Sequence, residues 1–102
     1  MAGYVQIIEF ETSRYDEVKQ LTDDYRAKRE AEARGPMPLR STVTQDRARP
    51  GVYMNIVEFE SYEKAMENSQ RPDTFDFATQ MMKLCDGAPQ FYDLDVEESW
   101  TP

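Results

Sequence analysis

The feature that most constrains the fold of this chain is a nine-residue segment that occurs twice. YVQIIEFET runs from Tyr4 to Thr12, and YMNIVEFES runs from Tyr53 to Ser61, with five identical positions and four chemically similar ones. Both copies are rich in β-branched and aromatic residues and lack helical spacing, so each is predicted to form a strand. Side chains alternate between the two faces of a strand, and here both alternating sets are apolar. Both faces of the predicted sheet should therefore be apolar.

The segment after the first copy is predicted to be an amphipathic helix. Ser13 followed by Asp16 is typical of a capped helix start. Gly35 is expected to end the helix, and a proline follows it directly. The residues that form the predicted buried face are spaced by three and four positions: Tyr15, Val18, Leu21, Thr22 and Tyr25.

The segment after the second copy is predicted to be helical as well. Ser61 is its expected cap, Arg71-Pro72 is expected to interrupt it, and Asp73 to restart it. Gly87 is predicted to end it, and Pro89 follows. The predicted buried stripe of its second part consists of Phe77, Ala78, Met81, Met82 and Cys85.

Two further strands complete the expected order. Leu39–Asp46 alternates and is rich in threonine, and a turn at Arg49-Pro50-Gly51 leads into the second copy of the repeat. Phe91–Trp100 is the last strand, with tyrosine, leucine and valine on one face and acidic residues on the other. The order β-α-β-β-α-β predicts an α+β, ferredoxin-like fold: a four-stranded antiparallel sheet with two helices on one face. At 102 residues, the chain is expected to be a single domain, 1–102.

Two helices can cover only one face of such a sheet, so the other face would expose several large apolar side chains. A monomer rarely tolerates a patch of that kind. A second copy of the chain, packed sheet to sheet about a two-fold axis, is the simplest way to cover it. We therefore expect a homodimer through the open sheet face, which would make a dimeric α/β barrel.

The charge and the missing residue types exclude several functions. Twenty acidic against twelve basic residues give a net charge of −8, which disfavours nucleic acids and membrane surfaces as partners. No apolar run reaches the roughly 20 residues of a membrane span, and the start has no signal-like segment, so a cytoplasmic protein is expected. The chain has no histidine, the commonest general base near neutral pH. Cys85, the only cysteine, is expected to be a core residue rather than a nucleophile.

Two amides interrupt the apolar repeats. Gln6 and Asn55 both fall on the face that carries the tyrosine and phenylalanine residues of the two copies. One interpretation is a pair of satisfied structural hydrogen bonds, the usual fate of buried amides. The other is that both amides project into a cavity and orient a ligand. If a pocket exists, we expect it beside these two residues.

Acidic residues at alternate positions offer a second kind of site. Glu9 with Glu11, and Glu58 with Glu60, could form a cluster across neighbouring strands that binds Mg²⁺ or Ca²⁺. Charge runs are usually solvated strand ends, and this is the interpretation we prefer. No metal site is therefore predicted.

The segment VEFESYEKAMENSQRPDTFDFA resembles the dimeric α/β-barrel superfamily, in particular antibiotic-biosynthesis-monooxygenase-like and stress-responsive barrel proteins. These often show an aromatic-Glu-Ser-x-Glu pattern where the third strand enters the second helix, and Phe59–Glu63 matches it. NSQRPDTFDFA with LCDGAPQFYDLDV also resembles a group of short actinobacterial proteins without an assigned activity.

The resembled superfamily includes haem-degrading monooxygenases. These carry an Asn on the first strand, a Trp on the third strand and a His on the second helix that ligates iron. This chain has Gln6 and Phe59 at the first two places and no histidine, so haem degradation of that type is not expected.

The superfamily also includes cofactor-free monooxygenases that form quinones, and this activity needs no cofactor or metal. The resemblance implies that Gln6, Tyr53 and Asn55 would orient a quinol, and that Arg40 would stabilise its anion. Phe59 and Trp100 would supply an apolar wall.

Three functions remain open from the sequence. The first is a barrel that binds or oxygenates a small aromatic or apolar metabolite. The second is a non-catalytic binding or interaction domain of the stress-responsive kind. The third is a structural dimer whose acidic surface engages a basic protein. A deep cavity beside the amides would favour the first function, and a face filled with side chains would favour the others.

Overall fold

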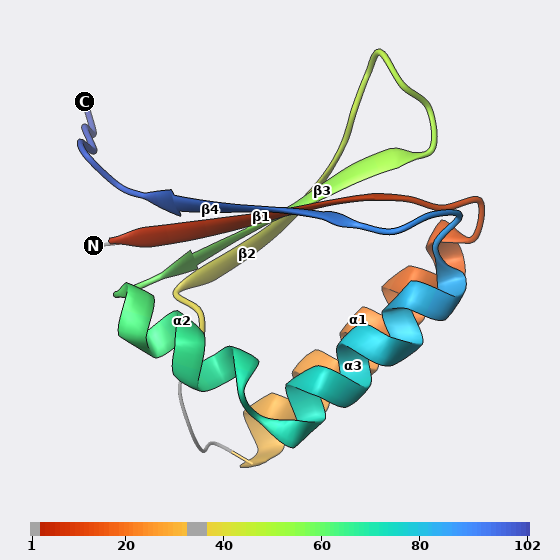
Figure 1. Cartoon of the computed structure of the whole chain (residues 1–102), viewed down its shortest axis with the longest axis horizontal. Helices are drawn as coiled ribbons and strands as arrows, with labels where there is room; N and C mark the ends of the chain where they lie inside the picture. Colours follow the sequence, from red (N-terminus) through yellow and green to blue (C-terminus); the bar gives the residue numbers. More distant parts are fainter. Residues whose placement is uncertain (1–2, 33–36) are drawn as a thin grey trace.

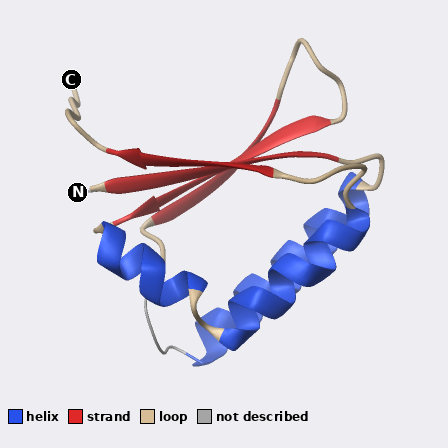
Figure 2. Ribbon diagram, viewed as in Figure 1, coloured by secondary structure: helices blue, strands red, loops and turns tan. Residues whose placement is uncertain are grey.

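The computed structural model describes residues 3–32 and 37–102, and its elements follow the predicted order (Figures 1 and 2). They are β1 (Tyr4–Glu11), α1 (Tyr15–Glu32), β2 (Arg40–Gln45), β3 (Val52–Phe59), α2 (Tyr62–Ser69), α3 (Pro72–Leu84) and β4 (Gln90–Asp95). The four strands form one antiparallel sheet in the order β2-β3-β1-β4. All the helices lie on one side of it (Figure 1). The predicted ferredoxin-like α+β fold is confirmed, with the second helix divided in two.

The two copies of the repeat are the two central strands of the sheet. β1 and β3 pair antiparallel, with Tyr4 opposite Phe59 and Phe10 opposite Tyr53. This register places Ile8 opposite Asn55. Residues opposite each other on paired strands share a face, and so do residues two apart on one strand. Gln6 is two residues from Ile8, so Gln6 and Asn55 lie on the same face, as predicted.

The helix-covered face of the sheet contains the best-buried cluster of the molecule. Tyr4, Val57 and Phe59 pack there against Ala65 of α2. The ring of Tyr4 lies edge-on to that of Tyr62, with the ring centroids 5.4 Å apart. Burial of such side chains stabilises a fold by about 1.5–3 kcal/mol each, so this cluster holds α2 against the sheet.

The opposite face of the sheet, which we call the open face, has no helix over it (Figure 2). It carries the other alternating set of apolar side chains, which the strand registers bring together: Val5, Ile7, Met54, Ile56, Tyr92 and Leu94. The central four are half-buried by their neighbours, and the two on the edge strand β4 are exposed. The prediction of a sheet that is apolar on both faces is confirmed.

One predicted helix cap is confirmed and the other is wrong. The Ser61 side chain accepts a hydrogen bond from the backbone N–H of Lys64 at the start of α2, as expected. At α1, however, the carbonyl of Arg14 accepts the first helical bond, from Val18, so Arg14 is the cap residue in place of Ser13. The predicted stop at Gly35 lies outside the described residues.

The interruption between α2 and α3 is confirmed. α2 ends at Ser69 and α3 begins at Pro72, where a missing N–H costs a helix nothing. The predicted buried stripe of α3 is partly wrong, because Ala78 is exposed and Met82 is 56% exposed. α3 packs chiefly on α1, where the rings of Tyr25 and Phe77 stack with centroids 4.4 Å apart. Its remaining faces are therefore left uncovered.

A buried arginine joins the three helices. Arg29 of α1 is 2% exposed, and its Nη1 donates to the Tyr25 hydroxyl at 2.7 Å and to Asn68 Oδ1 at 3.0 Å. Its Nε lies 4.0 Å from a carboxylate oxygen of Asp73. Arg71 pairs with the same carboxylate at 3.0 Å, which lowers the pKa of Asp73. These contacts hold the far ends of α1 and α3 together, away from the sheet.

The strand ends and turns differ from the predictions in detail. β4 ends at Asp95 rather than Trp100, although the backbone N–H of Val96 still donates to the carbonyl of Gly3. The residues beyond lead away from the sheet (Figure 1). The turn before β3 forms as predicted, with Gly51 at a φ of 89°, a conformation that favours glycine after proline in a type II turn. No helix in the described part of the chain is long and apolar enough to span a membrane.

Candidate functional site

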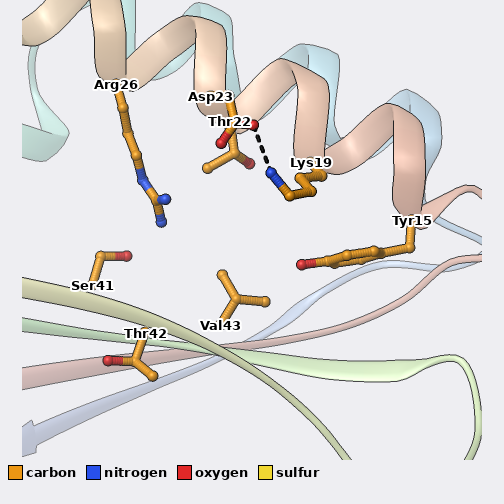
Figure 3. A pocket seen from close by; sticks show the side chains of 8 residues that line it. All are labelled: Tyr15, Lys19, Thr22, Asp23, Arg26, Ser41, Thr42 and Val43. Atoms are coloured by element: carbon orange, nitrogen blue, oxygen red, sulfur yellow. Dashed lines mark hydrogen bonds and ion pairs between the residues drawn. The ribbon is translucent and has the colours of Figure 1, made fainter.

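A cavity of about 290 Å³ lies between α1 and β2 on the helix-covered face (Figure 3). Its volume is at the lower end of the roughly 300–1,000 Å³ typical of small-molecule sites. The lining residues are Tyr15, Lys19, Thr22, Asp23 and Arg26 from α1, and Ser41, Thr42 and Val43 from β2. The cavity therefore suits a ligand of one or two rings.

The helical period explains why α1 presents these side chains together. Tyr15, Lys19, Thr22 and Arg26 are spaced by four, three and four residues, which places them on one face of a helix. In Figure 3 the tyrosine ring lies at one end of the cavity and the arginine reaches toward the sheet at the other. Val43 projects from β2 between them. The cavity thus has an aromatic end and a cationic end.

Asn55 is not one of the residues that line the cavity, but it is bonded to one of them and lies opposite another. The hydroxyl of Ser41 donates a hydrogen bond to Asn55 Oδ1 at 2.9 Å, and Val43 is the residue opposite Asn55 in the β2–β3 register. Because Oδ1 accepts from Ser41, the amide nitrogen of Asn55 is left as the donor end. Among the described residues, Asn55 makes no other side-chain hydrogen bond.

A stack of aromatic rings forms the aromatic end. The ring of Tyr15 lies on that of Tyr53 with centroids 4.4 Å apart and an interplanar angle of 12°. Tyr53 in turn stacks on Phe10, at 5.6 Å and 18°. Stacked rings of this kind fix one another's orientation and offer a flat apolar surface to a ligand.

The cavity wall carries more positive than negative charge. Lys19 Nζ pairs with Asp23 Oδ2 at 2.8 Å, and this hydrogen bond raises the pKa of the lysine, which therefore stays protonated. Arg26 has no hydrogen bond or ion pair within residues 3–32 and 37–102. The net charge of the whole chain is −8, so a wall with two cations and one anion stands out from its surroundings.

Gln6 lies on the same face as Asn55 but does not line this cavity. Its Nε2 donates to Asp93 Oδ1 at 3.1 Å, and the hydroxyl of Tyr4 donates to the same oxygen at 2.7 Å. Burial, together with this carboxylate, raises the pKa of Tyr4. Gln6 is therefore part of a hydrogen-bonded group with β4, which matches the structural interpretation of its amide.

The remaining predicted site residues lie apart from the cavity. Phe59 is 3% exposed and belongs to the packed cluster under α2. Arg40 points from the open face, where its side chain is 73% exposed and its Nε lies 3.8 Å from a Glu58 oxygen. Trp100 is 84% exposed on the segment that follows β4. The structure thus places Tyr53 against Tyr15 and Asn55 against Ser41, both of which line the cavity, and the roles of Tyr53 and Asn55 stay predictions.

The acidic positions do not converge on a metal site. Within the described residues, no group of three or more potential ligands could hold an ion. Glu9 instead lies 3.5 Å from Arg49, and Glu58 pairs with Arg40. Cys85 is half-buried, and burial raises the pKa of its thiol, which makes it a weaker nucleophile.

None of the predicted site residues is among the eight that line the cavity, all of which come from α1 and β2. The spacing of Lys19 and Arg26 relative to Tyr15 was visible, but charged residues on an amphipathic helix are usually solvated. Nothing in the sequence around Ser41 singles it out as a site residue. Asn55 could have led to Ser41, because the cross-strand neighbours of a residue can be predicted once the strand order is known.

Comparison with protein-family models and with curated proteins yields no match to this chain. Solved structures do match it. A candidate antibiotic biosynthesis monooxygenase of Caulobacter crescentus has a TM-score of 0.76 at 20% identity, over 95% of this chain and 92% of that one. SnoaB, a cofactor-independent oxygenase of Streptomyces nogalater, has a TM-score of 0.77 at 16% identity, over 97% of both chains.

A further candidate antibiotic biosynthesis monooxygenase, from Deinococcus radiodurans, matches with a TM-score of 0.71 at 11% identity over 97% of both chains. Identities this low establish the fold alone. They confirm the predicted resemblance at that level, while the narrower resemblance to short actinobacterial proteins stays a prediction. The chain therefore has the ferredoxin-like fold of antibiotic-biosynthesis-monooxygenase-like proteins.

Proposed function

We propose that this protein binds a small hydroxyaromatic compound in the cavity between α1 and β2 and oxygenates it without a cofactor. The observation that carries the proposal is a cavity lined by a stacked tyrosine and two cations, with the amide of Asn55 oriented by a hydrogen bond from Ser41 of the cavity wall. Similarity in fold to a cofactor-independent oxygenase supports the choice of reaction.

Each group has a role that its chemistry allows. The ring of the ligand packs against Tyr15 and Val43. The amide nitrogen of Asn55, held by the bond from Ser41, donates to the ligand's phenolic oxygen. Protonated Lys19 stabilises the phenolate at the moment it forms, since cations near an oxyanion lower its energy.

The proposed reaction converts a hydroxyarene with a free para position into a para-quinone. The phenolate supplies the four electrons that reduce O₂. One oxygen atom forms the new C=O at the para carbon, and the other leaves as water with the phenolic proton and the para hydrogen. The overall balance is one hydroxyarene and one O₂ giving one quinone and one H₂O. The protein has only to bind, orient and shield the substrate.

The open face supports a second part of the proposal, a homodimer. The chain exposes 7247 Å², whereas a compact monomer of its 11.9 kDa mass exposes about 6,000 Å². The excess is larger than the roughly 800 Å² that one partner buries in a standard interface. A second copy covers the open face, and the cavity on the other face stays accessible.

The test uses 5-hydroxy-2-naphthoate, a two-ring hydroxyarene whose para carbon is free. We expect binding by calorimetry, uptake of one O₂ per quinone formed, and ¹⁸O from ¹⁸O₂ in the quinone. Asn55→Leu should lower the rate about 100-fold, the effect of removing one oxyanion donor. Gln80→Leu, an amide removed from the exposed surface of α3, should leave it unchanged.

Binding without oxygen uptake would contradict the oxygenase and favour the alternative, a non-catalytic binding domain. Absence of binding by this compound and by its methyl ester would contradict the whole proposal.

A further inference from the structure

We propose that Arg26 forms an anion subsite at the far end of the cavity, opposite Ser41, so that the ligand carries a carboxylate or sulfonate remote from its phenol. This inference rests on the proposed function, because it names the substrate class of that same site. It assigns to Arg26 a positioning and specificity role that the phenol chemistry does not require.

The cavity wall carries a cation that its own acidic residue does not neutralise. Asp23 is occupied by Lys19 at 2.8 Å and so cannot neutralise a second cation. Five arginines in the described ranges make at least one ion pair: Arg14, Arg29, Arg40, Arg49 and Arg71. Arg26 and Arg47 make none there. Of these two, only Arg26 lines the cavity.

Arg26 and the aromatic end lie at opposite ends of the cavity. Arg26 lies eleven residues from Tyr15 on the same helix face, about 16 Å along the axis. Its guanidinium reaches toward Ser41 across the cavity, whereas the tyrosine ring lies at the other end (Figure 3). A naphthalene-sized ligand stacked at the aromatic end therefore has its far edge directed at the guanidinium.

A guanidinium presents planar donors that match the two oxygens of a carboxylate. Ser41 donates its only hydroxyl proton to Asn55 Oδ1, so its oxygen is left as an acceptor that can orient the guanidinium of Arg26 rather than as a donor to the anion. With a neutral ligand bound, the Arg26 guanidinium would have only water and the Ser41 oxygen as hydrogen-bond partners.

The experiment compares three ligands that differ only at the remote group: 5-hydroxy-2-naphthoate, its methyl ester and 5-hydroxynaphthalene-2-sulfonate. Affinities are measured by calorimetry on the full chain. We expect the carboxylate to bind about tenfold more tightly than the ester, as for a charge-assisted hydrogen bond. Arg26→Gln should abolish this preference, and the preference should decline as salt is raised.

Lys28→Gln is the matched control, since it removes one positive charge from the same helix outside the cavity. It should retain the preference of the unmodified chain. A sulfonate that binds as tightly as the carboxylate would mean a general anion subsite, and a weaker sulfonate would mean a carboxylate subsite; both support the inference.

Equal affinity of acid and ester in the unmodified chain would overturn the anion subsite and leave the proposed function standing. A preference that survives in Arg26→Gln would overturn the assignment to Arg26. Failure of all three ligands to bind would instead be the failure of the proposed function itself.

Discussion

The two faces of the sheet are built from the same two strands and yet have different surroundings. On β3, Val57 is buried under α2, whereas its neighbour Ile56 lies on the open face with no helix over it. The covered face contains the packed cluster and the cavity between α1 and β2, whereas no helix packs on the open face. Apolarity alone therefore does not define a core. What covers a face decides whether it becomes a core, a ligand site or an interface.

The largest expected effect comes from breaking the packed part of the covered face. Phe59→Ala removes a ring that is 3% exposed and contacts Tyr4 at 6.4 Å between centroids. We expect the free energy of unfolding to fall by about 3–5 kcal/mol, measured by urea denaturation. Phe75→Ala, at an exposed phenylalanine of α3, should cost less than about 1 kcal/mol. Similar costs at both positions would contradict the assignment of the core.

The next effect concerns the open face. Ile56→Asp places a charge where the proposed dimer buries apolar surface, so it should weaken dimerisation by about 2 kcal/mol or more while the monomer stays folded. Sedimentation velocity gives the mass and circular dichroism the fold. Thr79→Asp on α3 makes the same change in charge away from the interface and should remain dimeric. An unmodified chain that sediments as a monomer at micromolar concentration would refute the dimer.

A smaller effect is expected where the covered face joins β4. Tyr4→Phe retains the ring and removes the hydrogen bond to Asp93, at an expected cost of about 1.5 kcal/mol. The fold raises the pKa of this phenol above its usual value near 10. The contribution of the Tyr4 phenol to the free energy of unfolding is therefore complete below pH 10 and declines as the pH rises above that value. The unfolding free energy of the unmodified chain should decline more steeply above pH 10 than that of Tyr4→Phe; parallel curves would contradict this.

The smallest effect separates the two helix starts. Ser61→Ala should cost about 1 kcal/mol, because its side chain caps α2 over the packed cluster. Ser13→Ala should change the stability by only a few tenths of a kcal/mol, since Arg14 is the cap residue of α1 and no hydrogen bond of the Ser13 side chain is seen in the described part of the chain. Thermal melts of both variants check the difference, and equal losses would show that Ser13 caps α1 after all.

Much of the fold could be predicted because local signals and global arrangement agree in this chain. The repeat of Tyr4–Thr12 at Tyr53–Ser61 predicted the two central strands. The alternation of side chains along each strand predicted that Gln6 and Asn55 lie on one face. The failures have physical causes. Ser13 is not the cap residue because the Thr12 hydroxyl accepts a hydrogen bond from the backbone N–H of Arg14 at 2.9 Å. This bond places the start of the helix one residue later than predicted. Met82 is exposed because α3 packs on α1.

The candidate site was less predictable, because its parts come from different elements. Asn55 could be singled out as a polar residue in an apolar run. Lys19 and Arg26 could not, since only the approach of α1 to β2 turns a solvated helix face into a cavity wall. Arg40 was assigned to the site by resemblance, but its register with Glu58 places it on the other face.

In this proposal, the ligand and the partner subunit use opposite faces of one sheet. The most direct test of this arrangement is an NMR titration of the labelled protein with 5-hydroxy-2-naphthoate, following backbone amides along β2 and β3. We predict saturable shifts at Val43 and Asn55 beside the cavity, with a stoichiometry of one ligand per chain and little change at Leu94 on the open face. Shifts centred on Leu94 and Ile7, with Val43 unchanged, would contradict the account.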